Sequence, residues 1–247
     1  MKGKAIVNDR SAGVSLPMIV KQFSLATIAL SACLWAGQGS AAPLSPSLQS
    51  RLDVAVLAYE SGRWTEARAA FSALARQQVP AAHHNLAVMH LRGEVPQPSV
   101  ATARRLLTQA ARAGFVTSQF TLAQGLETGR FGRLEIELAM RWYEVAALGG
   151  SVAAQVEIGT AYYLGRGRPK DPALALRWFR EGAKGGDIGA MYLLASMYEH
   201  GEGVPSDLRL ARYWYGVAAE QGDEAAPGKV KELDARAAAR GALTTPL

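Results

Sequence analysis

The sequence predicts an all-α protein, a right-handed α-solenoid built from helix-turn-helix repeats. Glycines recur every 36 residues in two sets, and small and bulky residues keep the same period. A fixed period of this length is typical of repeat arrays, in which each unit buries its apolar face only against its neighbours. The two sets are Gly93, Gly129, Gly165 and Gly201, and Gly114, Gly150, Gly186 and Gly222.

Residues 1–42 are predicted to be an export signal. Four basic side chains precede an uncharged apolar run at 23–36, and small residues follow it. This order of charged, apolar and small segments is typical of secretory signals. The apolar run has 14 residues, whereas a membrane-spanning helix needs about 20. We therefore expect export to the periplasm.

Two ways of processing this signal stay open. The small residues favour ordinary cleavage after Ala41 or Ala42, and Pro43 favours the first of these. Alternatively, the stretch 30–33, Leu-Ser-Ala-Cys, resembles the lipobox of bacterial lipoproteins, in which the cysteine is acylated and becomes the new N-terminus. Cleavage would release a periplasmic or secreted protein, whereas lipidation of Cys33 would anchor the protein to a membrane.

Residues 43–79 are predicted to form a linker and one helical pair. Apolar residues recur at helical spacing on both sides of Gly62. Ala67 and Phe71 lie 36 residues before Ala103 and Leu107. The second helix of this pair is therefore in phase with the repeats that follow.

Residues 80–222 are predicted to hold four units of two helices each. In the last unit, apolar residues from Ala190 to Tyr198 share one helical face, and Gly201 is expected to end that helix. Asp207 is the expected N-cap of the second helix, as Asp171 is one unit earlier. Each unit should bury alanines against aromatic side chains of the neighbouring helix.

Residues 223–247 are predicted to form a capping helix and a tail. Val230, Leu233 and Ala237 recur at helical spacing within a charged segment at 229–240. Such a helix would shield the apolar side of the last repeat from water. From Gly241 onward the chain is expected to find nothing to pack against.

The two C-terminal units resemble Sel1-like repeats, a branch of the tetratricopeptide superfamily. The resemblance rests on the pattern Ala-x3-Leu-Ala-x2-Tyr-x2-Gly-x-Gly-Val-x2-Asp from Ala190, and on a close copy of it from Ala154. It covers residues 80–222, although 95–98 and 131–133 replace the Gly-x-Gly-Val loop in the two earlier units. Residues 43–79 resemble an ordinary tetratricopeptide unit. With the export signal, the resemblance implies an exported bacterial member of the family.

Composition and motifs predict no catalytic, cofactor or metal site. Beyond residue 42 the chain carries 23 basic and 20 acidic side chains, without the basic stripe expected of a nucleic-acid-binding protein. Cys33 is the only cysteine, so the repeats cannot hold a disulfide. The four histidines lack metal-binding spacing, and His83 and His84 are expected on a helix surface.

In the tetratricopeptide superfamily, the first helices of successive units line a concave groove that holds a peptide or a partner's helix. The resemblance implies such a groove here, with an aromatic ladder of Phe120, Tyr163 and Tyr192 as anchors, because aromatic residues dominate interface hot spots. The predicted groove residues are His84, Phe120, Gln124, Glu127, Val156, Thr160, Tyr163, Tyr192, Ser196 and Glu199.

Two functions follow from these expectations. The first is a non-enzymatic scaffold of the bacterial cell envelope that binds a protein or peptide in the groove, with no nucleic acid and with no membrane contact beyond a lipid at Cys33. The alternative is an exported enzyme, or a factor associated with one, that acts on cell-wall components. This alternative rests only on the resemblance, because such a role has been suggested for some exported members of the family.

Overall fold

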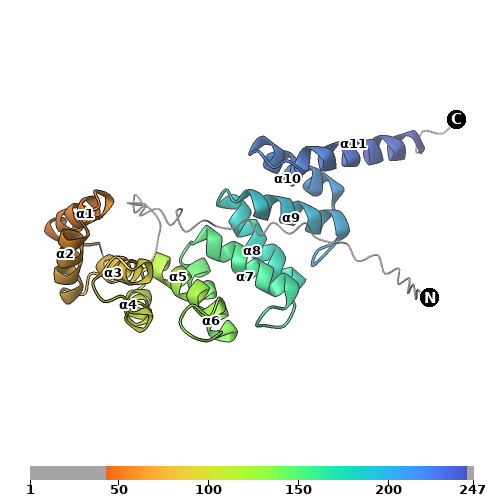
Figure 1. The fold of residues 1–247 in the computed structure, drawn as a ribbon. Helices are drawn as coiled ribbons and strands as arrows, with labels where there is room; N and C mark the ends of the chain where they lie inside the picture. The colour runs from red at the N-terminus through yellow and green to blue at the C-terminus, as the bar shows by residue number, and fades with distance from the viewer. Residues whose placement is uncertain (1–42, 244–247) are drawn as a thin grey trace, which may run out of the picture. The chain divides into compact units, whose positions relative to one another are not determined.

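The computed structural model describes residues 43–243, and the regular structure in this range is entirely α-helical (Figure 1). The predicted export signal, including Cys33, lies outside the described residues. The helices are α1 (Pro46–Glu60), α2 (Trp64–Arg76), α3 (Pro80–Arg92), α4 (Val100–Arg112), α5 (Val116–Glu127), α6 (Ile136–Leu148), α7 (Val152–Leu164), α8 (Pro172–Lys184), α9 (Ile188–His200), α10 (Leu208–Glu220) and α11 (Ala226–Leu243).

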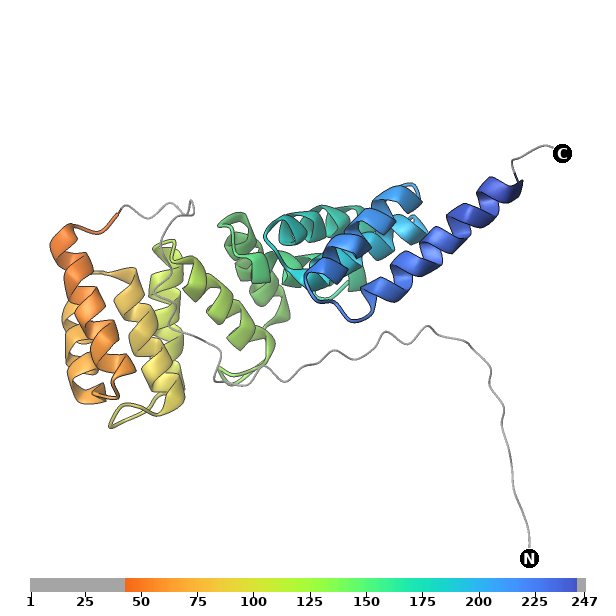
Figure 2. The ribbon, with the colours of Figure 1, turned by 90° about the horizontal axis from the view of Figure 1, so that it is seen from above.

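Each helix packs against the next one along the chain, which is the contact pattern of a solenoid (Figure 2). The predicted all-α fold is confirmed. We call α1, α3, α5, α7 and α9 the first helices and α2, α4, α6, α8 and α10 the second helices. Repeats 1 to 4 are the pairs α3–α4, α5–α6, α7–α8 and α9–α10.

The two sets of glycines end the two kinds of helix. Those at the ends of the first helices have φ between 69° and 76°, and those after the second helices have φ between 84° and 97°. Backbone with positive φ is costly for any residue with a Cβ atom. The 36-residue period of glycine therefore reflects one left-handed residue after each of the two helices of every repeat.

Aspartate caps begin the second helices of repeats 3 and 4, as predicted. Asp171 Oδ1 accepts a hydrogen bond from the backbone N–H of Leu174 at 2.9 Å. Asp207 Oδ1 accepts one from Leu210 at 3.1 Å. Each cap satisfies an N–H group that has no partner within its own helix.

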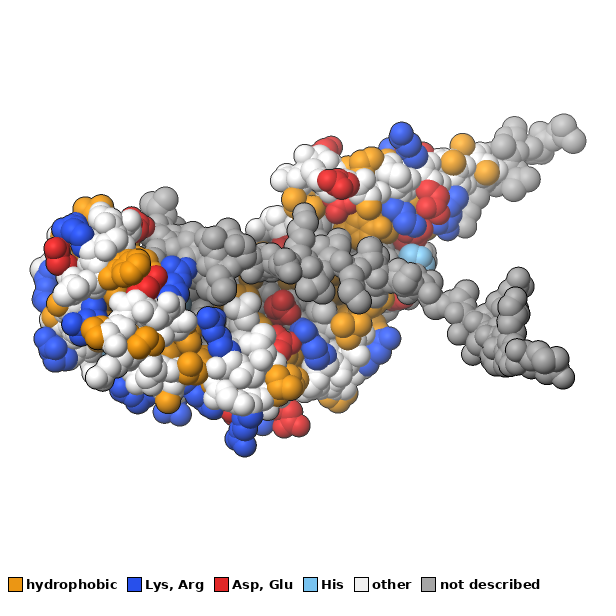
Figure 3. Space-filling view, in the orientation of Figure 1, with side chains coloured by type: hydrophobic (Ala, Val, Ile, Leu, Met, Phe, Trp, Pro, Cys, Tyr) orange, Lys and Arg blue, Asp and Glu red, His pale blue; other side chains and the backbone are white. Residues whose placement is uncertain are grey.

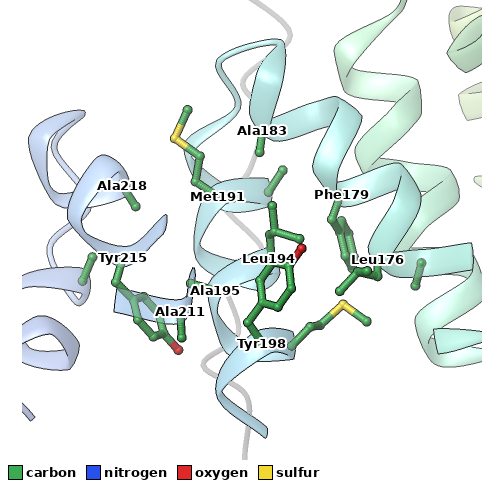
Figure 4. Close-up of a cluster of buried hydrophobic side chains, with 14 of the residues drawn as sticks. Leu176, Phe179, Ala183, Met191, Leu194, Ala195, Tyr198, Ala211, Tyr215 and Ala218 are labelled. Carbon is green, nitrogen blue, oxygen red and sulfur yellow. The ribbon is translucent and has the colours of Figure 1, made fainter. Parts of the chain in front are cut away.

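The core runs between helices, and Figure 4 shows α9 placed between α8 and α10. Phe179, Leu194 and Tyr215 are at most 1% exposed. Ala195 and Ala211 are fully buried between these larger side chains. Small residues facing aromatic ones allow the helix axes to approach closely, as the sequence predicts.

The helices of repeats 1 and 2 form despite their divergent loops. In repeat 2, Phe131 stands where repeats 3 and 4 have the second glycine of the Gly-x-Gly loop. Its ring lies directly over Gly125, where an added Cβ atom would be only 2.2 Å from the ring. Gly125 on α5 therefore makes room for the aromatic side chain that replaces the loop glycine.

The C-terminal helix differs in part from its prediction. Leu233 is buried, but Ala237 is exposed. The helix continues through Gly241 to Leu243, so the first three residues of the predicted tail are helical. Ala226 lies 36 residues after Ala190 and both are fully buried, which makes α11 the first helix of an incomplete fifth unit.

Candidate functional site

The predicted groove residues lie on α3, α5, α7 and α9, the first helices of the four repeats. Their exposure differs widely. Gln124 is exposed, and seven others are partly buried, whereas His84 and Glu199 are buried. The predicted set therefore contains two kinds of side chain. Some are accessible to a partner, and others are buried in contacts between helices of the solenoid.

The aromatic ladder packs against aromatic residues of the second helices. Each of the three first-helix residues is partly buried by this contact. Edge-to-face or tilted ring pairs at these distances stabilise packing. The pairs are Phe120 with Tyr143 at 5.5 Å between centroids, Tyr163 with Phe179 at 6.4 Å, and Tyr192 with Tyr215 at 5.0 Å.

Glu199 joins repeat 4 to the capping helix. Its carboxylate accepts a hydrogen bond from Tyr215 Oη at 3.0 Å and one from Arg236 Nη1 at 3.0 Å, and it lies 3.4 Å from Lys229 Nζ. Burial, and then the hydrogen bond to Glu199, raise the pKa of Tyr215. The side chain is only 4% exposed, so Glu199 is a structural link and is not open to a partner.

The equivalent position in repeat 2 makes the same kind of link. Glu127 accepts a hydrogen bond from Tyr143 Oη at 2.8 Å and lies 2.7 Å from Nη1 of Arg166, which belongs to the loop of repeat 3. Burial, followed by the charge of Glu127, raises the pKa of Tyr143. In both repeats a first-helix carboxylate thus accepts a hydrogen bond from a tyrosine hydroxyl of its own repeat and forms an ion pair with a cation of the next unit.

In repeat 3 the residue at this position is Tyr163. Here the first helix supplies the hydrogen-bond donor and the loop of the next repeat supplies the carboxylate. Tyr163 Oη donates a hydrogen bond to Glu202 Oε2 at 2.6 Å, from the loop of repeat 4. This bond, with a smaller effect of burial, raises the pKa of Tyr163 to about 12. Further toward the N-terminus, Tyr59 Oη donates to Glu94 in the loop of repeat 1 at 2.7 Å.

The sequence predictions missed the loop partners in these links. Arg166 and Glu202 are the middle residues of the Gly-x-Gly motifs of repeats 3 and 4, and the repeat pattern predicts a loop there but no role for either side chain. A spacing in the sequence could have indicated these pairs. A charged residue between two glycines lies 39 residues after a polar first-helix residue, as Arg166 follows Glu127 and Glu202 follows Tyr163. Each loop reaches back to the preceding first helix.

A smaller surface stays open along the first helices. Thr160 and Ser196 are partly exposed, and the Thr160 hydroxyl donates to the Val156 carbonyl oxygen of its own helix at 2.8 Å. Val156 itself packs partly against the core of repeats 3 and 4. We define the first-helix surface as Phe120, Gln124, Val156, Thr160, Tyr192 and Ser196.

A family model described as Sel1 repeat matches four consecutive stretches, 80–115, 116–151, 152–187 and 188–223. The chain belongs to the Sel1 repeat family. The boundaries between the matched stretches fall in the turns that follow each second helix. Sel1 repeat proteins are generally protein-interaction scaffolds. A comparison with curated proteins found no match.

Two solved structures resemble this Sel1 repeat protein. A protective antigen present in uropathogenic Escherichia coli strains shares 26% identity over 74% of the chain, with a TM-score of 0.69. A Sel1 repeat protein from Oxalobacter formigenes shares 31% identity over 68% of the chain, with a TM-score of 0.64. The chain matches 40% and 49% of the lengths of these two proteins.

The histidines of this Sel1 repeat protein differ from expectation. His83 and His84 were expected on a helix surface, but each is only 6% exposed. His84 Nδ1 lies 2.8 Å from Ser118 Oγ of the next repeat, and its ring packs against Phe115. His83 Nδ1 lies 3.2 Å from the Val79 carbonyl oxygen at the start of its own helix, so neither ring faces solvent freely.

Burial of His84 should make the stability of the protein depend on pH. Burial lowers the pKa of His84 to about 4 from 6.5 in the unfolded chain. Below pH 6.5 the unfolded chain therefore binds the extra proton first, and stability falls as the pH drops toward 4, by about 3 kcal/mol in all. We expect His84→Gln to lose this part of the pH dependence, measured by urea unfolding from pH 7 to pH 4.

The matched control is His200→Gln, which changes an exposed histidine at the end of α9. Its pH profile should follow that of the unaltered protein. If His84→Gln and His200→Gln gave the same profile, the buried histidine would not be the source of the effect.

Between residues 43 and 243, no three His, Cys, Asp or Glu side chains gather closely enough to hold a metal ion. None of the helices described in this range combines the length and the apolar character needed to cross a membrane.

Proposed function

We propose that this Sel1 repeat protein is a non-enzymatic adaptor of the bacterial cell envelope that binds a protein partner through its first-helix surface. The family supports the general role, since Sel1 repeat proteins are typically non-catalytic scaffolds. The envelope location rests on the sequence of residues 1–42, with its basic, apolar and small segments.

One observation carries the choice of surface. Uncharged polar side chains recur at the same position of three consecutive first helices, as Gln124, Thr160 and Ser196. Phe120 and Tyr192 flank this row, each with part of its ring exposed. Aromatic anchors beside hydrogen-bonding groups are the composition that interfaces favour. An extended peptide or a partner's helix could therefore contact several repeats at once.

The polar links between units support this proposal. Loop residues Arg166 and Glu202 hold the ends of α5 and α7, so the spacing between the first helices is set before a partner arrives. A surface that is ordered in advance avoids part of the entropy loss of binding. The buried groove residue Glu199 contributes in the same way, by holding α11 in place.

The proposal is tested by adding bulk to this row without removing core contacts. Replacing Gln124, Thr160 and Ser196 together by lysine places three long charged side chains across the surface, and lysine is well tolerated in helices. We expect crosslinking pull-down from an envelope fraction to recover a partner with the unaltered protein and to lose it with this variant.

The control carries three lysines on the second helices instead, at the exposed positions Ala69, Val145 and Ala173. It should keep the partner. Loss of the partner from both variants, or from neither, would contradict the proposed surface. Sequencing the N-terminus of the same sample tests the location: a start near Ala42 or an acylated Cys33 supports export, whereas an intact residue 1–42 segment argues against it.

A further inference from the structure

The outer face of α4 is the most basic helix surface in the described part of the chain. This helix carries Arg104, Arg105 and Arg112 and has no acidic residue. Their side chains, with Thr108, Gln109 and the ring of Phe131, line an open depression of about 570 Å³. The depression lies on the second helix of repeat 1, away from the first-helix surface.

One arginine of this depression is held in place and two are not. Arg104 makes a bidentate pair with Glu135, at 2.8 Å and 3.2 Å, and its guanidinium lies 6.0 Å from the centre of the Phe131 ring. The side chains of Arg105 and Arg112 are exposed and form no ion pair or hydrogen bond with any residue between 43 and 243. One side of the depression is therefore held in place by Arg104, and the guanidinium groups of Arg105 and Arg112 are available to a ligand.

Charge is distributed unevenly between the two kinds of helix. The second helices carry 11 basic and 5 acidic side chains, whereas the first helices carry 2 basic and 5 acidic ones. In Figure 3, Lys and Arg side chains recur along the edge that holds α2, α4 and α6. Positive charge concentrated in this way attracts an anionic partner, and arginine pairs well with carboxylates.

Features next to the depression limit the size of the anionic partner. On α6, the neighbouring second helix, Glu137 is exposed and Glu144 is partly exposed. Glu144 pairs with Arg168 at 3.4 Å, and Arg141 is exposed on the same helix, so the positive charge of α4 does not continue along α6. A long polyanion or an anionic membrane that extended from α4 across repeat 2 would therefore gain no further attraction there. The Phe131 ring also offers an apolar contact. Both features favour a short segment that combines acidic and apolar side chains.

The charge of Arg105 also reaches two histidines of α3. The pKa values of His83 and His90 are lowered chiefly by burial, and further by the positive charge of Arg105. An anion placed on Arg105 would offset that part of the lowering. These two rings can therefore report occupancy of the depression.

We propose that the α4 depression is a second docking site, which takes a short acidic segment of a partner protein with its carboxylates on Arg105 and Arg112 and an apolar side chain against Phe131. This site is separate from the first-helix surface. The adaptor then holds one partner on the second helix of repeat 1 and another on the first helices of repeats 2 to 4, or two parts of one partner.

The probe is a fluorescein-labelled peptide of alternating glutamate and leucine, and binding to the purified full chain is followed by fluorescence anisotropy. We expect Arg105→Gln with Arg112→Gln to weaken binding about tenfold or more, because two charge-assisted contacts are lost. The peptide should also raise the pH at which His83 and His90 titrate, as measured by NMR. A peptide with glutamine in place of glutamate should not bind.

Repeat 3 offers the matched control. Arg177 and Lys184 occupy the equivalent positions of α8, and Lys184 already pairs with Glu181 at 2.8 Å. Arg177→Gln with Lys184→Gln removes the same charge and should change binding less than about twofold. Equal weakening in both variants would overturn the proposal, because it would indicate nonspecific attraction. Binding to phosphatidylglycerol vesicles without binding to the peptide would also overturn it, in favour of an anionic lipid surface.

Discussion

Gly203→Ala is expected to destabilise the protein more than any other single methyl addition in the loops of repeats 3 and 4. Gly203 has φ of 72°, and an added Cβ atom would lie 2.5 Å from the carbonyl carbon and oxygen of Pro172 and 2.7 Å from the nitrogen of Ala173. These are backbone atoms at the start of α8 and cannot rotate away. We expect a loss of about 3 kcal/mol or more, since overpacking adds to the left-handed strain.

Gly186→Ala separates the cost of overpacking from the cost of the left-handed backbone conformation. Gly186 also has a positive φ, of 90°, but nothing lies within 4 Å of the added atom. Only the conformational cost should appear there, of about 1 to 2 kcal/mol. Urea unfolding of both variants measures the difference. Equal losses would show that the loop of repeat 4 can move away from α8, and that this contact does not hold the two repeats together.

Glu199→Gln is expected to loosen the capping helix. The substitution keeps the shape of the side chain but removes the charge that faces Lys229 and Arg236. Removing one partner of a fully buried ion pair costs about 3 to 5 kcal/mol. The two cations here are 29% and 41% exposed and can regain water, so we expect a loss of about 2 kcal/mol.

Glu232→Gln is the matched control for burial. Glu232 lies 3.2 Å from Lys229 and 3.9 Å from Arg236, the same two cations, but its side chain is 51% exposed. An exposed pair contributes about 0.5 kcal/mol or less. Hydrogen exchange along α11 should become faster in Glu199→Gln and stay unchanged in Glu232→Gln. Unchanged exchange in both would mean that α11 is held by its apolar contacts alone.

These links also connect stability with the proposed partner surface. Tyr163 and Glu202 join repeats 3 and 4, while Glu127 and Arg166 join repeats 2 and 3. Each link ties the end of a first helix to the loop of the next repeat, so it sets the spacing of the helices that carry Gln124, Thr160 and Ser196. Substitutions in the links should therefore weaken partner binding even though the link residues are largely covered.

Most of the fold could be predicted because it depends on local rules repeated at a fixed spacing. Gly201 ends α9 in a left-handed conformation, and Asp207 caps α10, as the sequence indicates. The continuation of α11 beyond Gly241 could not be predicted in this way. A glycine predicts a helix end only weakly, because helix length depends on what the helix packs against.

The candidate site was predicted less completely, and His84 and Glu199 show why. The 36-residue period places both residues on first helices. The period does not show, however, whether a polar side chain on such a helix faces solvent or a neighbouring repeat. The partners that bury them are Ser118, 34 residues away, and Arg236, 37 residues away. Contacts at that separation depend on how one repeat is rotated against the next.

The sequence by itself determined that this protein is a stack of two-helix units, because the 36-residue period of glycine, alanine and aromatic residues reflects backbone conformation and packing within each unit. Only the tertiary structure decided which side chains stay available to a partner. Exposure depends on the stacking of neighbouring units, which buries Glu199 under α11 and leaves Gln124 on α5 and Arg105 on α4 exposed to solvent.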